Sequence, residues 1–214
     1  MTEQTITFDG KSVSTERNGE YLDIYTDEEF LPHNLLDELT KLRELYICGE
    51  FLTSLPEGVF DKLVNLENLF ICGTGLTSLP SDMFDNLVNL KELTIYDNYE
   101  LTSLPKGIFD NLVNLKKLDI SYNKLTSLPP NIFNLETLAH LDMSRNCLEI
   151  LHSNIFDNLK TLVYLKLQWN KLNALPISIC KCKNLEYFTY DNNDIFYIQL
   201  ELETFINKIK DKQY

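Results

Sequence analysis

Five cysteines and three histidines are the side chains in this 214-residue chain best suited to metal binding, redox chemistry or acid–base catalysis. Cys180 and Cys182 have the spacing of half a metal-binding knuckle, and Cys48 and Cys72 recur in similar surroundings. The odd cysteine count without a disulfide-framework spacing favours a reducing compartment. Whether any of these thiols is reactive therefore depends on where the fold places it.

Nucleophilic catalysis has little support in the sequence. It contains no GxSxG, HExxH, P-loop or dinucleotide-binding motif. His140 is expected near Asp119 and Asp142 and could act as a base, but no Ser or Cys nucleophile with an orienting group is placed around it. An ion-paired surface histidine is the better interpretation, and we predict neither enzymatic activity nor a cofactor or metal site.

The net charge restricts the class of partner. With 32 acidic and 19 basic residues the chain carries −13 charges, which disfavours phosphate-rich partners such as nucleic acid and anionic membranes. The N-terminus lacks the basic and apolar regions of a signal peptide, and no stretch approaches the roughly 20 apolar residues of a membrane span. We predict a cytoplasmic protein that is monomeric alone, unless a specialised secretion system exports it.

Seven repeated units of 23 to 25 residues dominate the sequence. The second unit, LENLFICGTGLTSLPSDMFDNLVN, fits L-x-x-L-x-L-x-x-N-x-L-x-x-L-P-x-x-x-F-x-x-L at most fixed positions, and a partial unit over residues 31–42 precedes the first. The units begin at Leu42, Leu66, Leu90, Leu115, Leu138, Leu162 and Leu185.

These repeats resemble the leucine-rich repeat family over about residues 22–198. The LPxxxFxxL form is similar to the repeats of Toll-like receptors and variable lymphocyte receptors, whose cysteine-rich caps this chain lacks. The resemblance implies a horseshoe-shaped solenoid of α/β type with a parallel inner β-sheet, which binds proteins on its concave face.

The spacing of apolar residues within a unit also predicts this architecture. The fourth and sixth positions are apolar, as in Leu118 and Ile120 or Leu165 and Leu167, and such alternation indicates a strand with one buried face. One strand per unit cannot close a core, so neighbouring units must stack their strands in parallel. After its strand each unit must lead the chain back to the start of the next strand, and we call this part the return segment. The phenylalanines of the return segments should fill the space behind the sheet: Phe60, Phe84, Phe109, Phe133 and Phe156.

An asparagine follows most strands, where the chain must turn away from the sheet. Its amide can satisfy backbone groups that lose their strand partners, and stacked copies can bridge successive units. Glu50 and Thr74 replace it in the first two units, which predicts a weaker row at the N-terminal end. The asparagines are Asn98, Asn123, Asn146, Asn170 and Asn193.

We expect three regions, with a β cap over residues 1–30, the solenoid over 31–198 and a capping helix over 199–214. Asp9-Gly10 and Asn18-Gly19 suit tight hairpin turns, so the N-terminal cap should be an antiparallel meander. The C-terminal cap rests on apolar residues at helical spacing, namely Leu202, Phe205, Ile206 and Ile209.

The positions between the buried ones should line the concave face. They carry two aromatic groups there, one near the N-terminal end (Tyr46, Phe70 and Tyr96) and one toward the C-terminal end (Tyr164, Trp169 and Tyr187). Exposed aromatic side chains dominate protein-interface hot spots. The alternative is that they suit any sheet surface and merely stack on one another.

Acidic residues lie between the aromatic groups and favour a partner with Lys or Arg, unless this face is simply solvated. An insertion in the third unit either displays Tyr99 or forms a neutral bulge. The candidate partner-binding residues are Tyr46, Phe70, Glu92, Tyr96, Asp97, Tyr99, Asp119, Tyr122, Asp142, Arg145, Tyr164, Trp169 and Tyr187.

The cysteine pairs differ in their expected environment. Cys48 and Cys72 share one repeat position and should be neighbours about 5 Å apart on the concave face. They form either a redox or soft-metal pair or two small apolar side chains. Cys180 and Cys182 fall on buried Phe and Leu positions of the repeat, so we assign both to the core.

The sequence therefore predicts a non-enzymatic protein-recognition module whose concave face binds a protein with a basic patch. The first alternative is an adapter or targeting subunit, or a host-directed effector, that recruits another protein's enzymatic activity such as ubiquitin transfer. The second is a thiol-based redox protein that uses Cys48 and Cys72.

Overall fold

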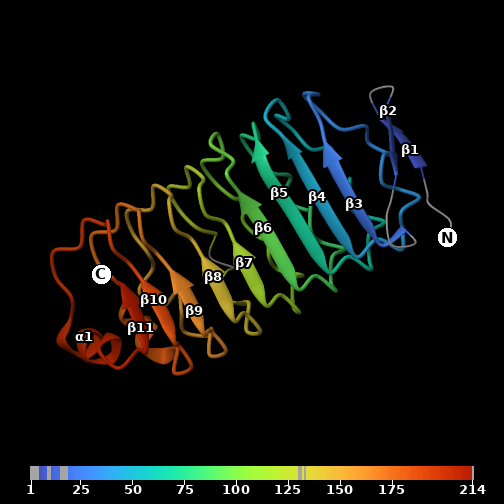
Figure 1. The fold of residues 1–214 in the computed structure, drawn as a ribbon. Helices are drawn as coiled ribbons and strands as arrows, with labels where there is room; N and C mark the ends of the chain where they lie inside the picture. The colour runs from blue at the N-terminus through green and yellow to red at the C-terminus, as the bar shows by residue number, and fades with distance from the viewer. Residues whose placement is uncertain (1–4, 9–10, 15–18, 130–131, 133, 214) are drawn as a thin grey trace.

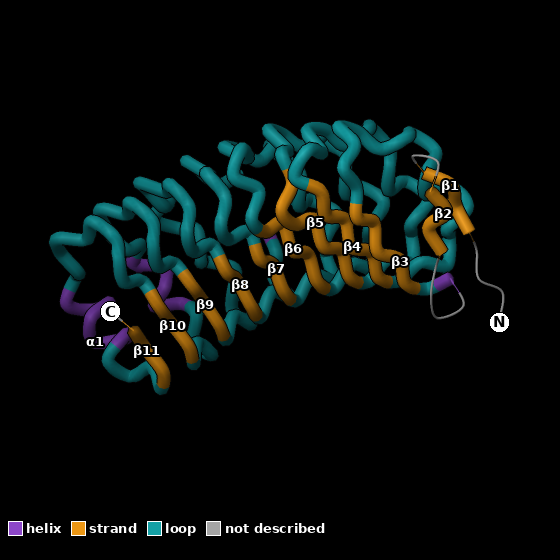
Figure 2. Tube along the Cα trace, turned by 45° about the horizontal axis from the view of Figure 1, so that its top comes forward, coloured by secondary structure: helices purple, strands orange, loops and turns teal. Residues whose placement is uncertain are grey.

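The computed structural model describes residues 5–8, 11–14, 19–129, 132 and 134–213. Within these residues the chain coils regularly, and each coil adds one strand to a nine-stranded sheet (Figure 1). The coils form a shallow arch whose inner, concave side carries the strands (Figure 2). The predicted solenoid with a parallel inner sheet is confirmed.

All neighbouring strands of this sheet are parallel, and each strand pairs with the same repeat positions one unit further along. Residues one unit apart are therefore lateral neighbours. In sequence order the strands are β3 (Tyr21–Tyr25), β4 (Glu44–Gly49), β5 (Asn68–Thr74), β6 (Glu92–Tyr96), β7 (Lys117–Asp119), β8 (His140–Asp142), β9 (Tyr164–Lys166), β10 (Tyr187–Thr189) and β11 (Asp211–Gln213).

The core lies between the sheet and the return segments. Leu118, Ile120, Leu165 and Leu167 have no solvent exposure, as the alternating pattern predicted. The described return-segment phenylalanines are also buried, and Phe133 lies outside the described residues. Cys180 and Cys182 are buried as well, with exposed fractions of 8% and 0%, as expected for cysteines that replace core residues.

The predicted asparagine row connects consecutive coils. Asn146 illustrates it, because its Oδ1 accepts a hydrogen bond from Leu125 N (3.0 Å) in the preceding coil while its Nδ2 donates to Ile120 O (2.9 Å) there. At the N-terminal end the row stops at Thr74, whose N–H and hydroxyl both donate to Asn98 Oδ1. Glu50 is exposed. The row is thus weaker at this end, as expected.

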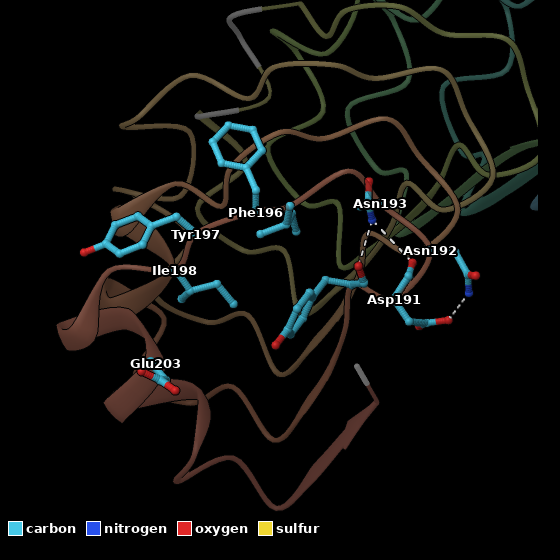
Figure 3. A pocket seen from close by; sticks show the side chains of 9 residues that line it. Asp191, Asn192, Asn193, Phe196, Tyr197, Ile198 and Glu203 are labelled. Atoms are coloured by element: carbon cyan, nitrogen blue, oxygen red, sulfur yellow. Dashed lines mark hydrogen bonds between the residues drawn. The ribbon is translucent and has the colours of Figure 1, made fainter.

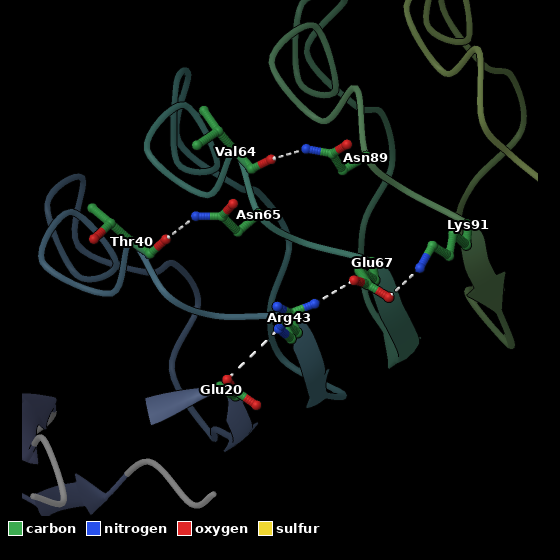
Figure 4. A network of polar contacts seen from close by, with 8 residues as sticks. All are labelled: Glu20, Thr40, Arg43, Val64, Asn65, Glu67, Asn89 and Lys91. Carbon is green, nitrogen blue, oxygen red and sulfur yellow. Dashed lines mark hydrogen bonds and ion pairs between the residues drawn. The ribbon is translucent and has the colours of Figure 1, made fainter. Parts of the chain in front are cut away.

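A second row of polar contacts joins the return segments and was missed in the sequence. Asn65 Nδ2 donates to Thr40 O (2.8 Å) and Asn89 Nδ2 to Val64 O (2.9 Å), each bond reaching the preceding coil (Figure 4). Nearby, Glu67 forms ion pairs with Arg43 and Lys91 on either side. These contacts tie adjacent coils together on the side opposite the asparagine row.

The N-terminal region differs from the predicted meander. Strands β1 (Thr5–Phe8) and β2 (Lys11–Ser14) are antiparallel, but β3 joins the solenoid sheet in parallel with β4. The reason is that Leu22 and Ile24 of β3 are buried like the repeat leucines, so β3 acts as the strand of an additional coil. The expected turns at Asp9-Gly10 and Asn18 lie outside the described residues.

The C-terminal helix is shorter than expected. A short 3-10 helix, η3 (Ile177–Lys181), precedes it, and α1 (Leu200–Ile206) buries Leu202 and Ile206. After α1 the chain turns, buries Ile209, and adds β11 to the edge of β10. An open parallel edge leaves backbone groups unpaired, which explains why the last residues form a strand. The domain boundaries and capping roles stay predictions.

Candidate functional site

The first part of the candidate site is an aromatic stack at the N-terminal end of the concave face. The rings of Tyr46 and Phe70 stack at 4.0 Å with an interplanar angle of 4°, and Tyr21 adds a tilted ring 5.8 Å from Tyr46. Burial and, after it, the nearby Glu44 carboxylate raise the pKa of Tyr46 to about 12. Tyr96 is not part of this stack, because its ring lies against Tyr122 instead.

The backbone directly after the strands adopts an unusual conformation that sequence reasoning missed. In each of the second to seventh units one residue at or near the end of the strand lies in the left-handed region, with φ between 54° and 62°. This region suits Gly and is tolerated by Asp and Asn, but it costs bulky residues roughly 1–2 kcal/mol. The residues are Gly73, Asp97, Tyr122, Arg145, Trp169 and Asn192.

Four side chains at this edge form a continuous row, which we call the edge row (Tyr96, Tyr122, Arg145 and Trp169). The rings of Tyr96 and Tyr122 are 5.0 Å apart. The Arg145 guanidinium lies 4.7 Å from the Tyr122 ring and 4.9 Å from the Trp169 ring, so it contacts an aromatic face on both sides. Trp169 is 48% exposed. The row therefore projects a cation held between aromatic rings.

A second stack lies at the C-terminal end of the concave face. Tyr164 and Tyr187 stack at 4.3 Å, and the His140 ring lies 5.6 Å from Tyr164. The Lys166 ammonium lies 5.2 Å from the Tyr164 ring. Trp169 belongs to the edge row instead. The two expected aromatic groups are thus rearranged into two stacks and one edge row.

The acidic zone is partly neutralised by lysines from neighbouring strands. Glu92 forms an ion pair with Lys117, and the carboxylate of Asp142 lies 3.2 Å from Lys166 Nζ. Burial lowers the pKa of Lys166, but hydrogen bonds to Tyr164 and Asp142 outweigh this effect and raise it above its usual value. Sequence spacing located the acids but did not reveal these pairs, because long lysine side chains reach across strands.

Asp119 of this zone is hydrogen-bonded to a serine that follows its own strand. Its Oδ1 accepts hydrogen bonds from Ser121 N (2.9 Å) and Oγ (2.6 Å). Burial raises its pKa above the usual value, the Ser121 bonds oppose this shift, and the nearby Asp142 adds to it. Two acids, Asp119 and Asp142, and two lysines, Lys117 and Lys166, line a cavity of about 280 Å³ together with His140.

The insertion in the third unit displays a tyrosine. Tyr99 is 57% exposed, and its hydrogen bond to Asp97 raises the pKa of the phenol. The other Asp97 oxygen, Oδ1, is buried and makes no hydrogen bond within the described residues. Tyr99 and Asp97 thus form a small unit next to Tyr96 of the edge row.

The described residues contain no group of three or more side chains that could hold a metal ion. Cys48 and Cys72 are neighbours in register on β4 and β5, and both are half-buried free thiols. His140 is exposed, and its ring lies against that of Tyr164. In the part of the chain that the structure describes, no helix is both long and apolar enough to traverse a bilayer.

A surface near α1 was also missed in the sequence. A cavity of about 620 Å³ lies between the last coil and this helix, and Phe196, Tyr197, Ile198 and Glu203 line one side of it (Figure 3). Phe196 is 85% and Tyr197 66% exposed. These residues follow the last complete repeat pattern, so repeat positions gave no expectation for them.

Sequence comparison identifies one matching family. The family model described as "Leucine rich repeat" matches residues 40–99, 88–148 and 114–172, which together span more than half of the chain. No curated protein sequence matches this chain.

Several solved structures share the fold. A chain in the glycosylated Toll–Spatzle complex from Drosophila superposes with a TM-score of 0.79 and 26% identity, over 90% of this chain and 26% of that one. The APL1 leucine-rich repeat domain gives 0.70 and 24%, over 81% and 44%. The leucine-rich repeat domain of the type III effector XopL gives 0.68 and 22%, over 86% and 72%.

The first of these chains is much longer than this one, which spans about a quarter of its length. The APL1 and XopL domains are less than 25% identical to this chain and support its fold alone.

Proposed function

The chain belongs to the leucine-rich repeat family, and from this premise we propose that it is a non-enzymatic recognition module whose concave face binds a partner protein. The fold is typical of protein-interaction modules, and the Toll–Spatzle complex contains a similar solenoid. Its nine strands hold side chains at fixed spacing, so binding costs little ordering entropy.

The edge row is the observation that carries this proposal. Its Tyr, Trp and Arg side chains are the types most enriched in interface hot spots. Tyr122, Arg145 and Trp169 each occupy a left-handed position that Gly73 fills in the second unit. A bulky side chain there costs stability, and partner binding supplies a reason for this cost.

Charge supports a partner with a basic patch. The net charge of −13 would steer a cationic surface toward this protein. Glu92 and Asp142 already have lysine partners, so among these acids Asp119 is the one we propose for contact with an incoming Lys or Arg, beside the Lys117 and Lys166 that line the same cavity.

Mutation of the edge row tests the proposal. Tyr96→Ala/Trp169→Ala should reduce binding to proteins captured by the wild-type chain from its source cells by about 10- to 100-fold, as expected for hot-spot residues. Ile150→Ala is the matched control, because Ile150 is 70% exposed but lies outside the strands. Thermal unfolding should show that all three proteins are folded. An unchanged set and amount of captured proteins would contradict the proposal.

An adapter that recruits another protein's enzymatic activity is the second candidate. It needs a second surface away from the concave face, and the exposed Phe196, Tyr197 and Leu200 favour one beside α1. Phe196→Ala/Tyr197→Ala should then lose a subset of captured proteins that the edge-row variant keeps. If both variants lose the same proteins, a separate recruiting surface is wrong.

A further inference from the structure

We propose that Cys48 and Cys72 form a dithiol site that a peroxide oxidises to a reversible disulfide between β4 and β5. This inference is independent of the proposed partner binding, because it depends only on the placement of two thiols. It assigns a modification site to the N-terminal end of the concave face, where the edge row is absent.

The register of the sheet brings the two thiols together. Cys48 pairs directly with Cys72, and in-register parallel neighbours have Cα atoms about 4.8 Å apart, within the 4.4–6.8 Å range of disulfides. The preceding residues Ile47 and Ile71 are fully buried. Because side chains alternate along a strand, both thiols point to the concave side.

The surroundings leave the pair accessible. Both thiols are only half-buried, and Gly49 and Gly73 follow them without side chains. A Cβ at Gly73 would have no neighbour within 4 Å. Tyr25 and Tyr96 pair with Cys48 and Cys72 on the outer sides of the two strands, so the thiols face each other across the strand pair.

The two thiols also influence each other's ionisation. A hydrogen bond between them lowers the pKa of Cys48 and raises that of Cys72. One thiol can therefore ionise while the other remains protonated and donates to the thiolate. A thiolate beside a second thiol is the arrangement that disulfide formation requires.

The chemistry needs only a peroxide. The Cys48 thiolate attacks one oxygen of hydrogen peroxide, the O–O bond breaks, and the sulfenic acid forms while hydroxide leaves and takes up a proton as water. The Cys72 sulfur then attacks the sulfenic sulfur, the S–S bond forms as the S–O bond breaks, and the leaving hydroxide takes the Cys72 proton to become a second water. Two electrons pass from the two thiols to the peroxide, and excess dithiothreitol reverses the change.

Mass spectrometry of the peroxide-treated full chain tests this site. We expect two thiols to disappear together, the mass to fall by two hydrogens, and tryptic peptides 44–62 and 63–91 to become linked. Dithiothreitol should restore both thiols. The proposal is overturned if the linked peptides contain other cysteines, or if Cys48 proceeds to sulfinic acid with Cys72 still reduced.

Serine variants provide matched controls. Cys147→Ser removes another half-buried thiol, which lies after β8, and should form the disulfide as the wild type does. Cys72→Ser should stop at a Cys48 sulfenic acid that dimedone traps, and Cys48→Ser should lose its remaining Cys72 thiol only slowly. If Cys72→Ser consumes peroxide no faster than Cys48→Ser, Cys48 is not the attacking thiol and the mechanism is wrong. Partner capture is not part of this readout, so failure of the edge-row experiment leaves the result unaffected.

Discussion

The N-terminal and C-terminal halves of the concave sheet end their strands in different ways. β4 and β5 have six and seven residues, whereas β7 to β10 have three residues each. Just after β7 and β8 the N–H groups of Ser121 and Ser144 donate to the carboxylates of Asp119 and Asp142 two residues earlier. These two N–H groups bond within their own coil, while the N–H of Ile120 still donates to Asp142 O of the next coil.

The N-terminal half lacks this device. Tyr46 and Phe70 occupy the positions of the aspartates and have no carboxylate to accept such a bond, and β4 and β5 continue to Gly49 and Thr74. The same repeat thus places two thiols on β4 and β5 at the N-terminal end of the sheet and the edge row further toward the C-terminal end. The comparison teaches that the residues around the strand end, more than the leucines, decide which side chains a coil displays.

Loss of an asparagine should show the largest difference between the halves. Asn146→Ala removes bonds to Leu125 N and Ile120 O and leaves these buried groups unsatisfied, so we expect a loss of about 3 kcal/mol. Glu50→Ala, at the equivalent position of the first unit, should change stability by less than about 0.5 kcal/mol, since Glu50 is exposed. Urea denaturation measures both. Equal effects would show that the row does not distinguish the two ends.

The two glycines of the N-terminal half should respond unequally. A Cβ at Gly49 would lie 2.3 Å from Thr26 O, a backbone atom that cannot move away easily. Gly49→Ala should therefore cost at least about 2 kcal/mol. Gly73 has φ 60° and open space around it, so Gly73→Ala should cost only about 1 kcal/mol. The reverse order in thermal unfolding would contradict this account.

The sequence predicted the fold, but it did not predict most of the difference between the two halves of the sheet. Burial of Leu118 and Leu165 and the role of Asn146 follow from spacing alone, because each repeat position has one environment in a stacked solenoid. The left-handed backbone at Trp169 does not, since it depends on hydrogen bonds made by neighbouring residues. The contact of Arg145 with two rings also depends on this backbone.

Charge pairing was predicted less well than burial. The acids Glu92 and Asp142 were correctly placed on one face, but their lysine partners come from the next strand and are selected by side-chain reach. β11 was missed because pairing with an open sheet edge overrides the helical spacing that Ile209 continues. Tertiary context decided both outcomes.

Neutralising Asp119 should have a smaller effect that depends on pH. Burial raises its pKa in the folded state, so the folded protein holds this proton more tightly than the unfolded chain. Stability therefore falls as pH rises from the unfolded pKa through the folded one. Asp119→Asn should be as stable as the wild type or up to about 1 kcal/mol more stable at pH 7.

The pH series provides the control for this variant. Its advantage over the wild type should shrink as the pH falls through that window, because the wild-type carboxyl then becomes neutral as well. Asp85→Asn, which removes an exposed carboxylate of a return segment, reports the effect of net charge alone. A constant difference across the pH series would argue against a buried, charged Asp119.

The ion pairs at the two ends of the sheet should contribute least to the free energy of unfolding. Glu67→Gln breaks contacts to Arg43 and Lys91 at the N-terminal end and should cost about 0.5 kcal/mol at low salt. Glu186→Gln breaks the more exposed pair with Lys210 at the other end, and its cost should be smaller still. Added salt should reduce both costs in urea denaturation. A salt-independent loss would point to packing rather than charge.

The asparagine row also determines how this molecule can come apart. Each asparagine of the row bonds to the preceding coil as well as to its own, and the row ends at Thr74. Heat or mechanical pulling should therefore unzip the chain from its first coils, while the asparagine-linked coils hold together. Partial unfolding of the N-terminal end would separate β4 from β5, which carry Cys48 and Cys72, and leave the edge row in place.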